Sequence, residues 1–299
     1  MRQVLGAFVS VLLLTMWPSA DAWADNVSIQ RTGDGPLERC DQLRFSFDDE
    51  PARRGEQRLT IPFDEARTLS VSTPKHGGVH VQGVEGSTYS IQACKGVPAD
   101  ASPATLDQIS VSAQGGRLAI DGPADGKWVV YLIVQAPRAA GIDLDATNGP
   151  LTAAGLSGDV RVRSQNGPIK LSDCTGRVDV ESQNGPIQYS GQAGTVSITA
   201  QNGPLSVLLT GAEWRGTLNA RTQNGPVKLA LPSTFTSGVQ VQSSRNAPWK
   251  CAAAACSGGN RTWDEGQLAF TMGTGVPAVR LATTNGPVAI RDSTSRREY

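Results

Sequence analysis

The amino-acid sequence predicts an all-β protein with a single domain, a parallel β-solenoid (β-helix) with rungs of 18–22 residues. Three observations predict this fold. The segment from Gly141 to Gly238 consists of five sequence repeats, and a fixed period near 20 residues is typical of solenoids. Apolar and polar residues alternate within each repeat, which indicates strands. Each repeat turns at Asn-Gly-Pro and closes with Gly. The Asn residues of these structural turns, with that of one later repeat, are Asn148, Asn166, Asn184, Asn202, Asn224 and Asn285.

The second repeat shows the alternation most plainly. Val160 and Val162 precede its turn, Ile169 and Leu171 follow it, and charged residues stand between them. Such alternation places one set of side chains on a buried face of a strand and the other set in solvent. We therefore expect each repeat to give one strand before the Asn-Gly-Pro corner and one strand after it.

The Asn-Gly-Pro corner distinguishes two arrangements of these strands. Asn-Gly alone is a strong hairpin signal, and a hairpin in each repeat would give an antiparallel meander. Here Pro follows every time, and Pro lacks the N–H that would close a two-residue hairpin loop. A hairpin would also place Arg163 opposite Lys170, with like charges facing each other. The sequence therefore favours parallel stacking of the repeats, with the meander as the alternative.

Parallel stacking brings equivalent residues of successive repeats next to each other. The corner Asn side chains are then expected to form an amide ladder, with a ladder of Gln residues beside it. The outward charges alternate in sign along two columns, and opposite charges on neighbouring strands attract. These columns are Asp143, Arg161 and Asp179, and Asp145, Arg163 and Glu181; the Gln residues are Gln165, Gln183, Gln201 and Gln223.

Residues 1–24 have the pattern of a signal peptide. Arg2 precedes an apolar run from Val4 to Trp17, and small residues follow it. This run is shorter than a membrane span requires. Cleavage after an Ala-x-Ala site is expected to leave a mature chain that begins at Trp23 or Asp25 and does not span a membrane. The protein is then exported, and it is periplasmic, on the bacterial cell surface or secreted.

Outside the five repeats the pattern is less regular. Residues 25–66 carry two short strand signals among polar residues, and we expect them to form an N-terminal cap over the open edge of the first rung. The solenoid is expected over residues 67–292, with a flexible tail over 293–299. The apolar run from Trp128 to Val134 does not alternate, which indicates a strand covered on both faces.

A degenerate repeat follows the five regular ones. Val239 and Val241 are shifted by one residue against its corner at Asn246. Because a one-residue slip would exchange the two faces of a strand, this shift predicts a β-bulge. A repeat with Asn285 at its corner is then expected to form the last rung.

The charge and the His content limit the possible ligands. The chain has 27 basic and 27 acidic residues, so its net charge is zero, whereas a nucleic-acid binder should show a basic surface. We expect no nucleic-acid partner. His76 and His80 are the only histidines, and Gly77-Gly78 between them breaks any helix. We expect both His side chains to be exposed to solvent rather than to bind a metal, and we expect no cofactor.

Five Cys residues in an exported chain permit disulfides. Cys251 and Cys256 are close in sequence and can close a small loop. Cys40 and Cys94 can tie the cap to an early rung. Cys174 occupies the position of an inward-facing Leu of the preceding repeat, so we expect it to be a buried free thiol.

The fourth and fifth repeats have longer closing corners, residues 210–216 and 232–238. These insertions bring Trp214 and Phe235 to one edge of the coil, with Trp263 further along the chain. Insertions in a solenoid often mark its binding face, and aromatic rings suit sugars or protein partners. These three residues are therefore the candidate binding patch. The alternative is that the rings fold back and shield the flank of the coil.

Rows of alternating Val-x-Val, then Asn-Gly-Pro followed by Ile or Val, then a closing Gly, all behind a signal peptide, resemble the bacterial adhesin-like β-solenoid family of unknown function. The resemblance covers roughly residues 67–292. It implies interaction at the cell surface or envelope, and it brings no catalytic residues with it.

These observations favour an exported, non-enzymatic and monomeric protein with an adhesin-like binding or structural role, whose partner is a glycan or an envelope protein. Two alternatives remain open. Polysaccharide lyases and hydrolases also use parallel β-helices, although glycoside hydrolysis needs two carboxylates at a fixed separation and the carboxylates of the regular repeats have basic neighbours. The other alternative is a passive scaffold of an envelope complex.

Overall fold

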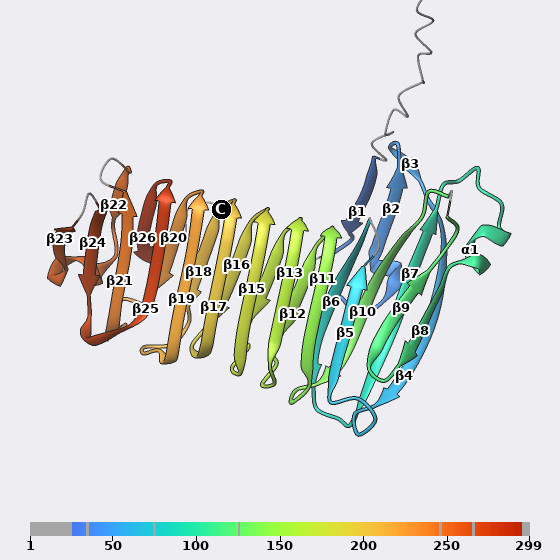
Figure 1. The fold of residues 1–299 in the computed structure, drawn as a ribbon, viewed down its shortest axis with the longest axis horizontal. Coiled ribbons are helices and arrows are strands. Elements are labelled where there is room, and N and C mark those ends of the chain that lie inside the picture. The colour runs from blue at the N-terminus through green and yellow to red at the C-terminus, as the bar shows by residue number, and fades with distance from the viewer. Residues whose placement is uncertain are drawn as a thin grey trace, which may run out of the picture.

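The computed structural model describes residues 26–33, 36–73, 76–124, 126–244, 247–264 and 267–294. The predicted signal peptide and residues 295–299 of the predicted tail lie outside these ranges. The described chain is an elongated all-β molecule with one small sheet and two large ones (Figure 1). Its described helical segments are short: α1 (Ala104–Gln108), η1 (Cys40–Gln42) and η2 (Ala254–Gly258).

Each of the five regular repeats gives one strand to each large sheet. The strand before the Asn-Gly-Pro corner joins the twelve-stranded sheet and the strand after it joins the eleven-stranded sheet. In the twelve-stranded sheet these strands are β11 (Gly141–Asn148), β13 (Val160–Asn166), β15 (Arg177–Asn184), β17 (Ala193–Asn202) and β19 (Arg215–Asn224). In the eleven-stranded sheet they are β12 (Leu151–Ala154), β14 (Ile169–Ser172), β16 (Ile187–Gly191), β18 (Leu205–Leu209) and β20 (Val227–Leu231).

Successive repeats pair in parallel and at equivalent positions. Val162 lies between Leu144 and Val180, and Leu171 lies between Ala153 and Tyr189. Because the repeat period sets this register, the inward residues of all repeats stack in columns between the two sheets. They form one continuous buried cluster that extends along the molecule. The predicted parallel pairing of the repeats is confirmed, and the hairpin meander is not formed by these strands.

The corner Asn residues form the predicted amide ladder. In each step the side-chain Nδ2 of one Asn donates to Oδ1 of the preceding Asn, at 2.9–3.0 Å. The ladder joins Asn148, Asn166, Asn184, Asn202, Asn224 and Asn285. The predicted Gln ladder does not form, because the four exposed Gln side chains beside the Asn ladder make no hydrogen bonds to one another.

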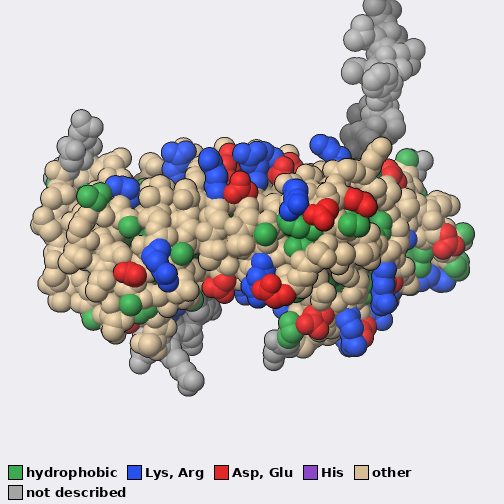
Figure 2. Space-filling model, turned by 90° about the horizontal axis from the view of Figure 1, so that it is seen from below, with side chains coloured by type: hydrophobic (Ala, Val, Ile, Leu, Met, Phe, Trp, Pro, Cys, Tyr) green, Lys and Arg blue, Asp and Glu red, His purple; other side chains and the backbone are tan. Residues whose placement is uncertain are grey.

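The outward charges of the twelve-stranded sheet stand in the two predicted columns, but only one of the expected pairings forms. Arg161 lies 3.9 Å from Asp179 within its column. Arg163 instead reaches diagonally across to Asp143, at 3.7 Å, and not to Asp145. A long Arg side chain can bridge diagonal as well as direct neighbours in a sheet. Figure 2 shows acidic and basic side chains interspersed along one long edge of the molecule.

The N-terminal end of the two large sheets contains parallel and antiparallel pairs and does not continue the regular repeats. β5 (Thr68–Thr73) and β6 (Gly77–Val84) pair in parallel with the first repeat. Beyond them, antiparallel pairs appear in both sheets. The strands at this end are β10 (Val129–Pro137), β7 (Thr88–Val97) and β4 (Arg53–Pro62) in one sheet, and β9 (Arg117–Asp121) and β8 (Ser110–Gln114) in the other.

The segment expected to be the N-terminal cap, residues 25–66, contributes strands to two sheets. Its last strand, β4, forms the edge of the eleven-stranded sheet. Its other strands form the small sheet, in which β1 (Val27–Arg31), β2 (Leu43–Phe47) and β3 (Glu50–Pro51) are antiparallel. A hydrophobic cluster with Phe45 and Phe47 at its centre packs this small sheet against the outer side of β10.

Strand β10 is covered on both faces, as its unbroken apolar run predicts. Val130, Leu132 and Val134 point into the main core. The intervening side chains, including Tyr131 and Ile133, contact the small sheet instead. Burial of both faces explains why this strand needs no polar alternation.

The C-terminal end of the chain folds back into the stack. β25 (Thr274–Asn285) and β26 (Val288–Asp292) pair directly with the fifth repeat, and β21 (Ser237–Ser244) and β22 (Trp249–Cys251) lie beyond them (Figure 1). The expectation that the Asn285 repeat is the last rung is therefore wrong. Its corner residue Asn285 extends the amide ladder by donating to Asn224 of the fifth repeat.

The edge of the twelve-stranded sheet is formed by an antiparallel pair, β24 (Gln267–Met272) and β23 (Asn260–Asp264). The pairing of β21 with β25 is irregular between Ser237 and Val239, where the extra residues belong to β25. The bulge predicted between Val241 and the corner at Asn246 falls on residues 245–246, which lie outside the described ranges. Val239 and Val241 lie on the buried face of β21, where both are at most 1% exposed.

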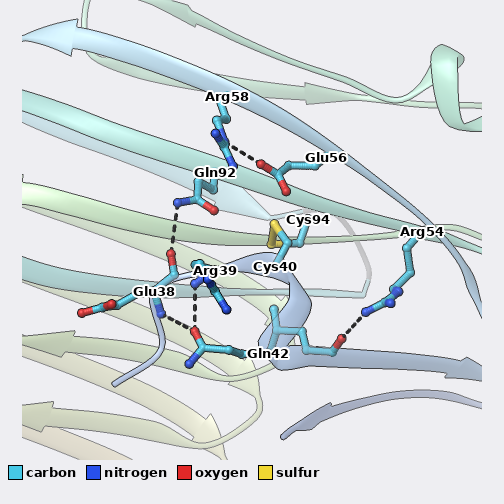
Figure 3. Close-up of a disulfide and its surroundings, with 10 residues drawn as sticks. Glu38, Arg39, Cys40, Gln42, Arg54, Glu56, Arg58, Gln92 and Cys94 are labelled. Atoms are coloured by element: carbon cyan, nitrogen blue, oxygen red, sulfur yellow. Dashed lines mark hydrogen bonds and ion pairs between the residues drawn. A yellow bond between two sulfur atoms is a disulfide. The ribbon is translucent and has the colours of Figure 1, made fainter. Parts of the chain in front are cut away.

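The two predicted disulfides are confirmed. Cys40 of η1 is bonded to Cys94 of β7, which ties the small sheet to the eleven-stranded sheet (Figure 3). Around this bond, Nε2 of Gln92 donates to the Glu38 carbonyl at 3.0 Å, and a guanidinium nitrogen of Arg54 donates to the Leu43 carbonyl at 3.1 Å. Cys251 is bonded to Cys256, and Cys174 is a buried free thiol, as expected.

Candidate functional site

The prediction of an aromatic binding patch assumed that the rings in the enlarged corners are exposed. This assumption is wrong for Trp214 and Phe235. Trp214 is 5% exposed and Phe235 is 6% exposed. The Trp214 ring lies 6.2 Å from the ring of Tyr189, and its backbone N–H donates to Ser237 Oγ at 2.9 Å. The two corners thus fold over the flank of the core, because the burial of large rings there excludes water from the inward columns. This is the shielding alternative.

Trp263 is the exception among the three aromatic candidates. It lies on the edge strand β23 and is 59% exposed. Since the other two rings are buried, the exposed aromatic surface is reduced to this single side chain. No binding patch of three rings exists among these residues.

A groove on the outer face of the eleven-stranded sheet is the better candidate. It has a volume of about 440 Å³ and crosses strands β14, β16, β18 and β20. Its outward-facing lining residues are Lys170, Gln188, Ser190, Ser206, Leu208, Lys228, Ala230 and Arg291. The side chains are those that the period-two alternation turns away from the core, so the repeat pattern itself builds the groove.

The outward residues of the eleven-stranded sheet stand in two columns across the strands. In the first column Lys170, Gln188, Ser206 and Lys228 are successive partners in the parallel register. The column continues through Ala289 to Lys250. The second column carries smaller or apolar residues and ends at Arg291, which pairs with Ala230.

The charge on this face differs from that on the other sheet. The outward positions of β6, β12, β14, β16, β18, β20 and β26 hold basic or neutral residues and no Asp or Glu. Within the described ranges, neither Lys170 nor Lys228 has an ion-pair partner. On the twelve-stranded sheet, by contrast, Arg161 and Arg163 both contact carboxylates. The eleven-stranded sheet therefore presents a face of net positive charge, although the whole chain is neutral.

His80 stands on the same face, two strands from Lys170. The expectation that it is exposed is wrong, since its side chain is half-buried beside the small sheet. Burial, followed by the positive charges of Arg31 and Lys170, lowers the pKa of His80 from 6.5 to about 4. Both causes disfavour the imidazolium, so His80 is neutral at physiological pH.

This pKa shift predicts acid sensitivity. As the pH falls through 6.5, His80 of the unfolded chain binds a proton, whereas His80 of the folded chain does not until about pH 4. The unfolded state therefore binds more protons between these values, and stability is lost as the pH falls. Relative to His80→Gln, the wild-type protein is expected to lose about 2–3 kcal/mol between pH 6.5 and 4. Urea unfolding at several pH values tests this, and equal pH slopes for the two proteins would contradict it.

Sequence reasoning missed the groove because it considered charge columns only before the Asn-Gly-Pro corner. The same alignment applied after the corner places Lys170, Gln188, Ser206 and Lys228 in one column with no acidic member. That contrast between the two sheets was the available signal. Arg291 could not be placed this way, because it depends on the return of the C-terminal strands into the stack.

The described part of the chain contains no group of three His, Cys, Asp or Glu side chains that could hold a metal ion. It also contains no helix that is long and apolar enough to cross a membrane. The chemical groups that the groove offers are ammonium, guanidinium, amide and hydroxyl groups. These groups suit the binding of a polar, anionic ligand.

A family comparison agrees with this repeat architecture. The model of the Toastrack DUF4097 family matches residues 39–259, which is most of the chain. The chain belongs to the Toastrack DUF4097 family. The family match spans both the five regular repeats and the antiparallel strands at the N-terminal end. No curated protein matches this Toastrack chain.

Three solved structures from bacteria are similar to this Toastrack chain. A "putative cell adhesion protein" from Clostridium sporogenes has a TM-score of 0.35 and 10% identity, over 80% of this chain and 99% of that one. A "putative adhesin" from Bacteroides fragilis has a TM-score of 0.37 and 12% identity, over 79% and 97%. A "putative lipid binding protein" from Parabacteroides distasonis has a TM-score of 0.26 and 9% identity, over 79% and 96%. At these values no function is transferred from them.

Proposed function

We propose that this chain is an exported binding module of the bacterial envelope or cell surface, and that its ligand occupies the groove on the eleven-stranded sheet. The observation that carries the proposal is the composition of that groove. Lys170 and Lys228 have no acidic neighbours in their outward column, on a sheet whose repeat strands are fixed by parallel pairing on both sides. A rigid, preformed surface binds without a large cost of ordering.

We infer that residues 67–292 act as one β-solenoid unit, with the mixed strands at its N-terminal end as part of the same stack. The common core and the continuous sheets support this description. A stack whose repeats contact only their neighbours is well suited to present a long, regular face. The protein is expected to act as a monomer.

Export is supported by two features of the chain. The apolar run near the N-terminus is followed by Ala-x-Ala sites. The two disulfides are stable in an oxidising compartment outside the cytoplasm. N-terminal sequencing of exported protein is expected to give a mature chain that begins at Trp23 or Asp25. Recovery of the intact N-terminus from the cytoplasm would contradict export.

A binding role fits the groove better than the enzymatic alternative. Glycoside hydrolysis requires two carboxylates flanking the scissile bond. The described residues that line the groove provide amide, hydroxyl and basic groups instead. The passive-scaffold alternative does not require a groove of this composition.

The proposal is tested by binding to an array of envelope glycans and envelope proteins. The mature chain is expected to bind at least one ligand saturably, and the ligand is expected to protect Lys170 and Lys228 from acetylation, as measured by mass spectrometry. Protection confined to another surface would place the site elsewhere. Release of shortened or unsaturated sugar products from an arrayed polysaccharide would instead support the enzymatic alternative.

A further inference from the structure

We infer that the groove on the eleven-stranded sheet binds a linear acidic polysaccharide, whose chain lies across the strands and whose carboxylates pair with Lys170 and Lys228. This inference rests on the proposed function and adds the chemical class of the ligand. It follows from the spacing of the basic groups, from their lack of acidic partners and from the polar floor between them.

The spacing of the basic groups favours a polymer over a small anion. Lys170 and Lys228 are three strand positions apart in one column, with Gln188 and Ser206 between them. At the usual spacing of paired strands, their Cα atoms are about 14 Å apart. Lys250 lies two strands further along the same column. The charges are thus distributed along the stack and do not converge on one point, which matches a chain with repeated negative charges.

The electrostatic environment favours an anion along this whole face. Two carboxylates stand at the ends of strands of this sheet: Asp173 follows β14 in an exposed turn, and Asp292 ends β26 and accepts the backbone N–H of Ala254 at 3.2 Å. Neither occupies the outward column of the two lysines. At the N-terminal end of the face, the charges of Arg31 and Lys170 both disfavour protonation of His80. The same positive field attracts a negatively charged ligand.

The floor of the groove favours a sugar over a lipid or a nucleic acid. Gln188, Ser190 and Ser206 supply amide and hydroxyl groups that can hydrogen-bond to sugar hydroxyls. The aromatic lining residue, Tyr189, is 1% exposed, and its hydroxyl is directed to the Cys174 carbonyl at 3.5 Å. It is therefore not available for base stacking, on which single-stranded nucleic-acid binding depends. The outward apolar side chains of the groove, Leu208 and Ala230, are too few to hold an acyl chain.

The experiment measures binding of the mature full chain to polygalacturonate, a linear polymer with one carboxylate per sugar. The wild-type protein is expected to bind it at low salt and to bind more weakly as salt screens the charges. The double variant Lys170→Gln/Lys228→Gln is expected to bind about tenfold more weakly, because two exposed ion pairs are lost. Lys170→Arg/Lys228→Arg keeps both charges and is expected to retain binding.

A matched control removes the same two charges from the other sheet. Arg221 and Arg280 are exposed on the twelve-stranded sheet, where they line a smaller groove of about 280 Å³. Arg221→Gln/Arg280→Gln is expected to bind polygalacturonate within about twofold of wild type, since those residues face away from the proposed site. Thermal unfolding of all three double variants verifies that each remains folded.

Several results would overturn the inference. Equal weakening by the two Gln double variants would show that binding follows total charge and not the groove. Equal binding of the neutral polymer dextran would show recognition of uncharged sugar, and the proposed binding function would then survive without the inference. Tighter binding of duplex DNA, or of vesicles of equimolar phosphatidylglycerol and phosphatidylcholine, would assign the basic face to another class of ligand. Absence of binding to any polymer, vesicle or arrayed ligand would reject both proposals.

Discussion

Replacement of Val162 with Asp is expected to lower the free energy of unfolding by about 4 kcal/mol or more, because it buries a carboxylate without a partner. Val162 is fully buried in β13, with Leu144 and Val180 as its neighbours in the stack. An Asp side chain at that position would lie among the apolar side chains of the main core. The strand cannot rotate the carboxylate outward, since a one-residue slip would bury Arg161 and Arg163 instead.

The matched control changes the next residue, which faces solvent. Arg163→Ser removes one exposed ion pair with Asp143 and is expected to cost less than about 1 kcal/mol. Val162→Ala removes volume without adding charge and is expected to fall between the two. Urea unfolding of the three variants measures the differences. Similar losses for Val162→Asp and Arg163→Ser would mean that the inward and outward faces of the repeats are assigned wrongly.

The features that the sequence predicts well are those that a local period determines. The alternation around Val162, the corner at Asn166 and the spacing of 18 residues together determine strand faces and the register between repeats. The amide ladder then follows, because equal register places each corner Asn beside the next one. The burial of Val239 and Val241 follows from the same alternation.

The features that the sequence does not predict depend on pairings between distant segments. β25 and β26 insert beside the fifth repeat, so the order of strands in space departs from the order in the chain. At the other end, β7 and β4 run antiparallel to their neighbours although their alternation is the same as that of a parallel strand. Alternation reports which face of a strand is buried, and it contains no information about the direction of its partner.

The candidate site shows the same limit. The sequence does not distinguish an aromatic ring that binds a ligand from one that covers the core, because both can stand in an inserted corner. Trp214 and Phe235 cover the core. The column with Lys170 and Lys228 could be aligned from the sequence, but its role depends on which charged side chains from other segments lie beside it. Only the arrangement of the small sheet and the C-terminal strands brings Arg31 and Arg291 to the same side as Lys170.

The stacked Asn-Gly-Pro corners are expected to tolerate no side chain on their glycines. Gly185 has a φ of +132°, a conformation that L-residues rarely adopt, and a Cβ there would lie 2.3 Å from the carbonyl oxygen of Gly167 in the preceding repeat. Its own N–H donates to the Asn202 carbonyl at 3.1 Å in the following repeat. The corner is thus held from both sides, and separation from its two neighbours would break the ladder hydrogen bonds of Asn184 with Asn166 and with Asn202.

Gly185→Ala is therefore expected to destabilise the protein by about 4 kcal/mol, since the clash is with backbone and adds to the strain of the positive φ. Gly115→Ala is the matched control. Gly115 also has a positive φ, +55°, but nothing lies within 4 Å of the position of its Cβ. That substitution is expected to cost only about 1 kcal/mol, the usual penalty of a left-handed residue. Urea unfolding compares the two. If both variants lose the same small amount of unfolding free energy, the corners can separate at little cost. Close stacking of the repeats would then not explain a rigid ligand-binding face.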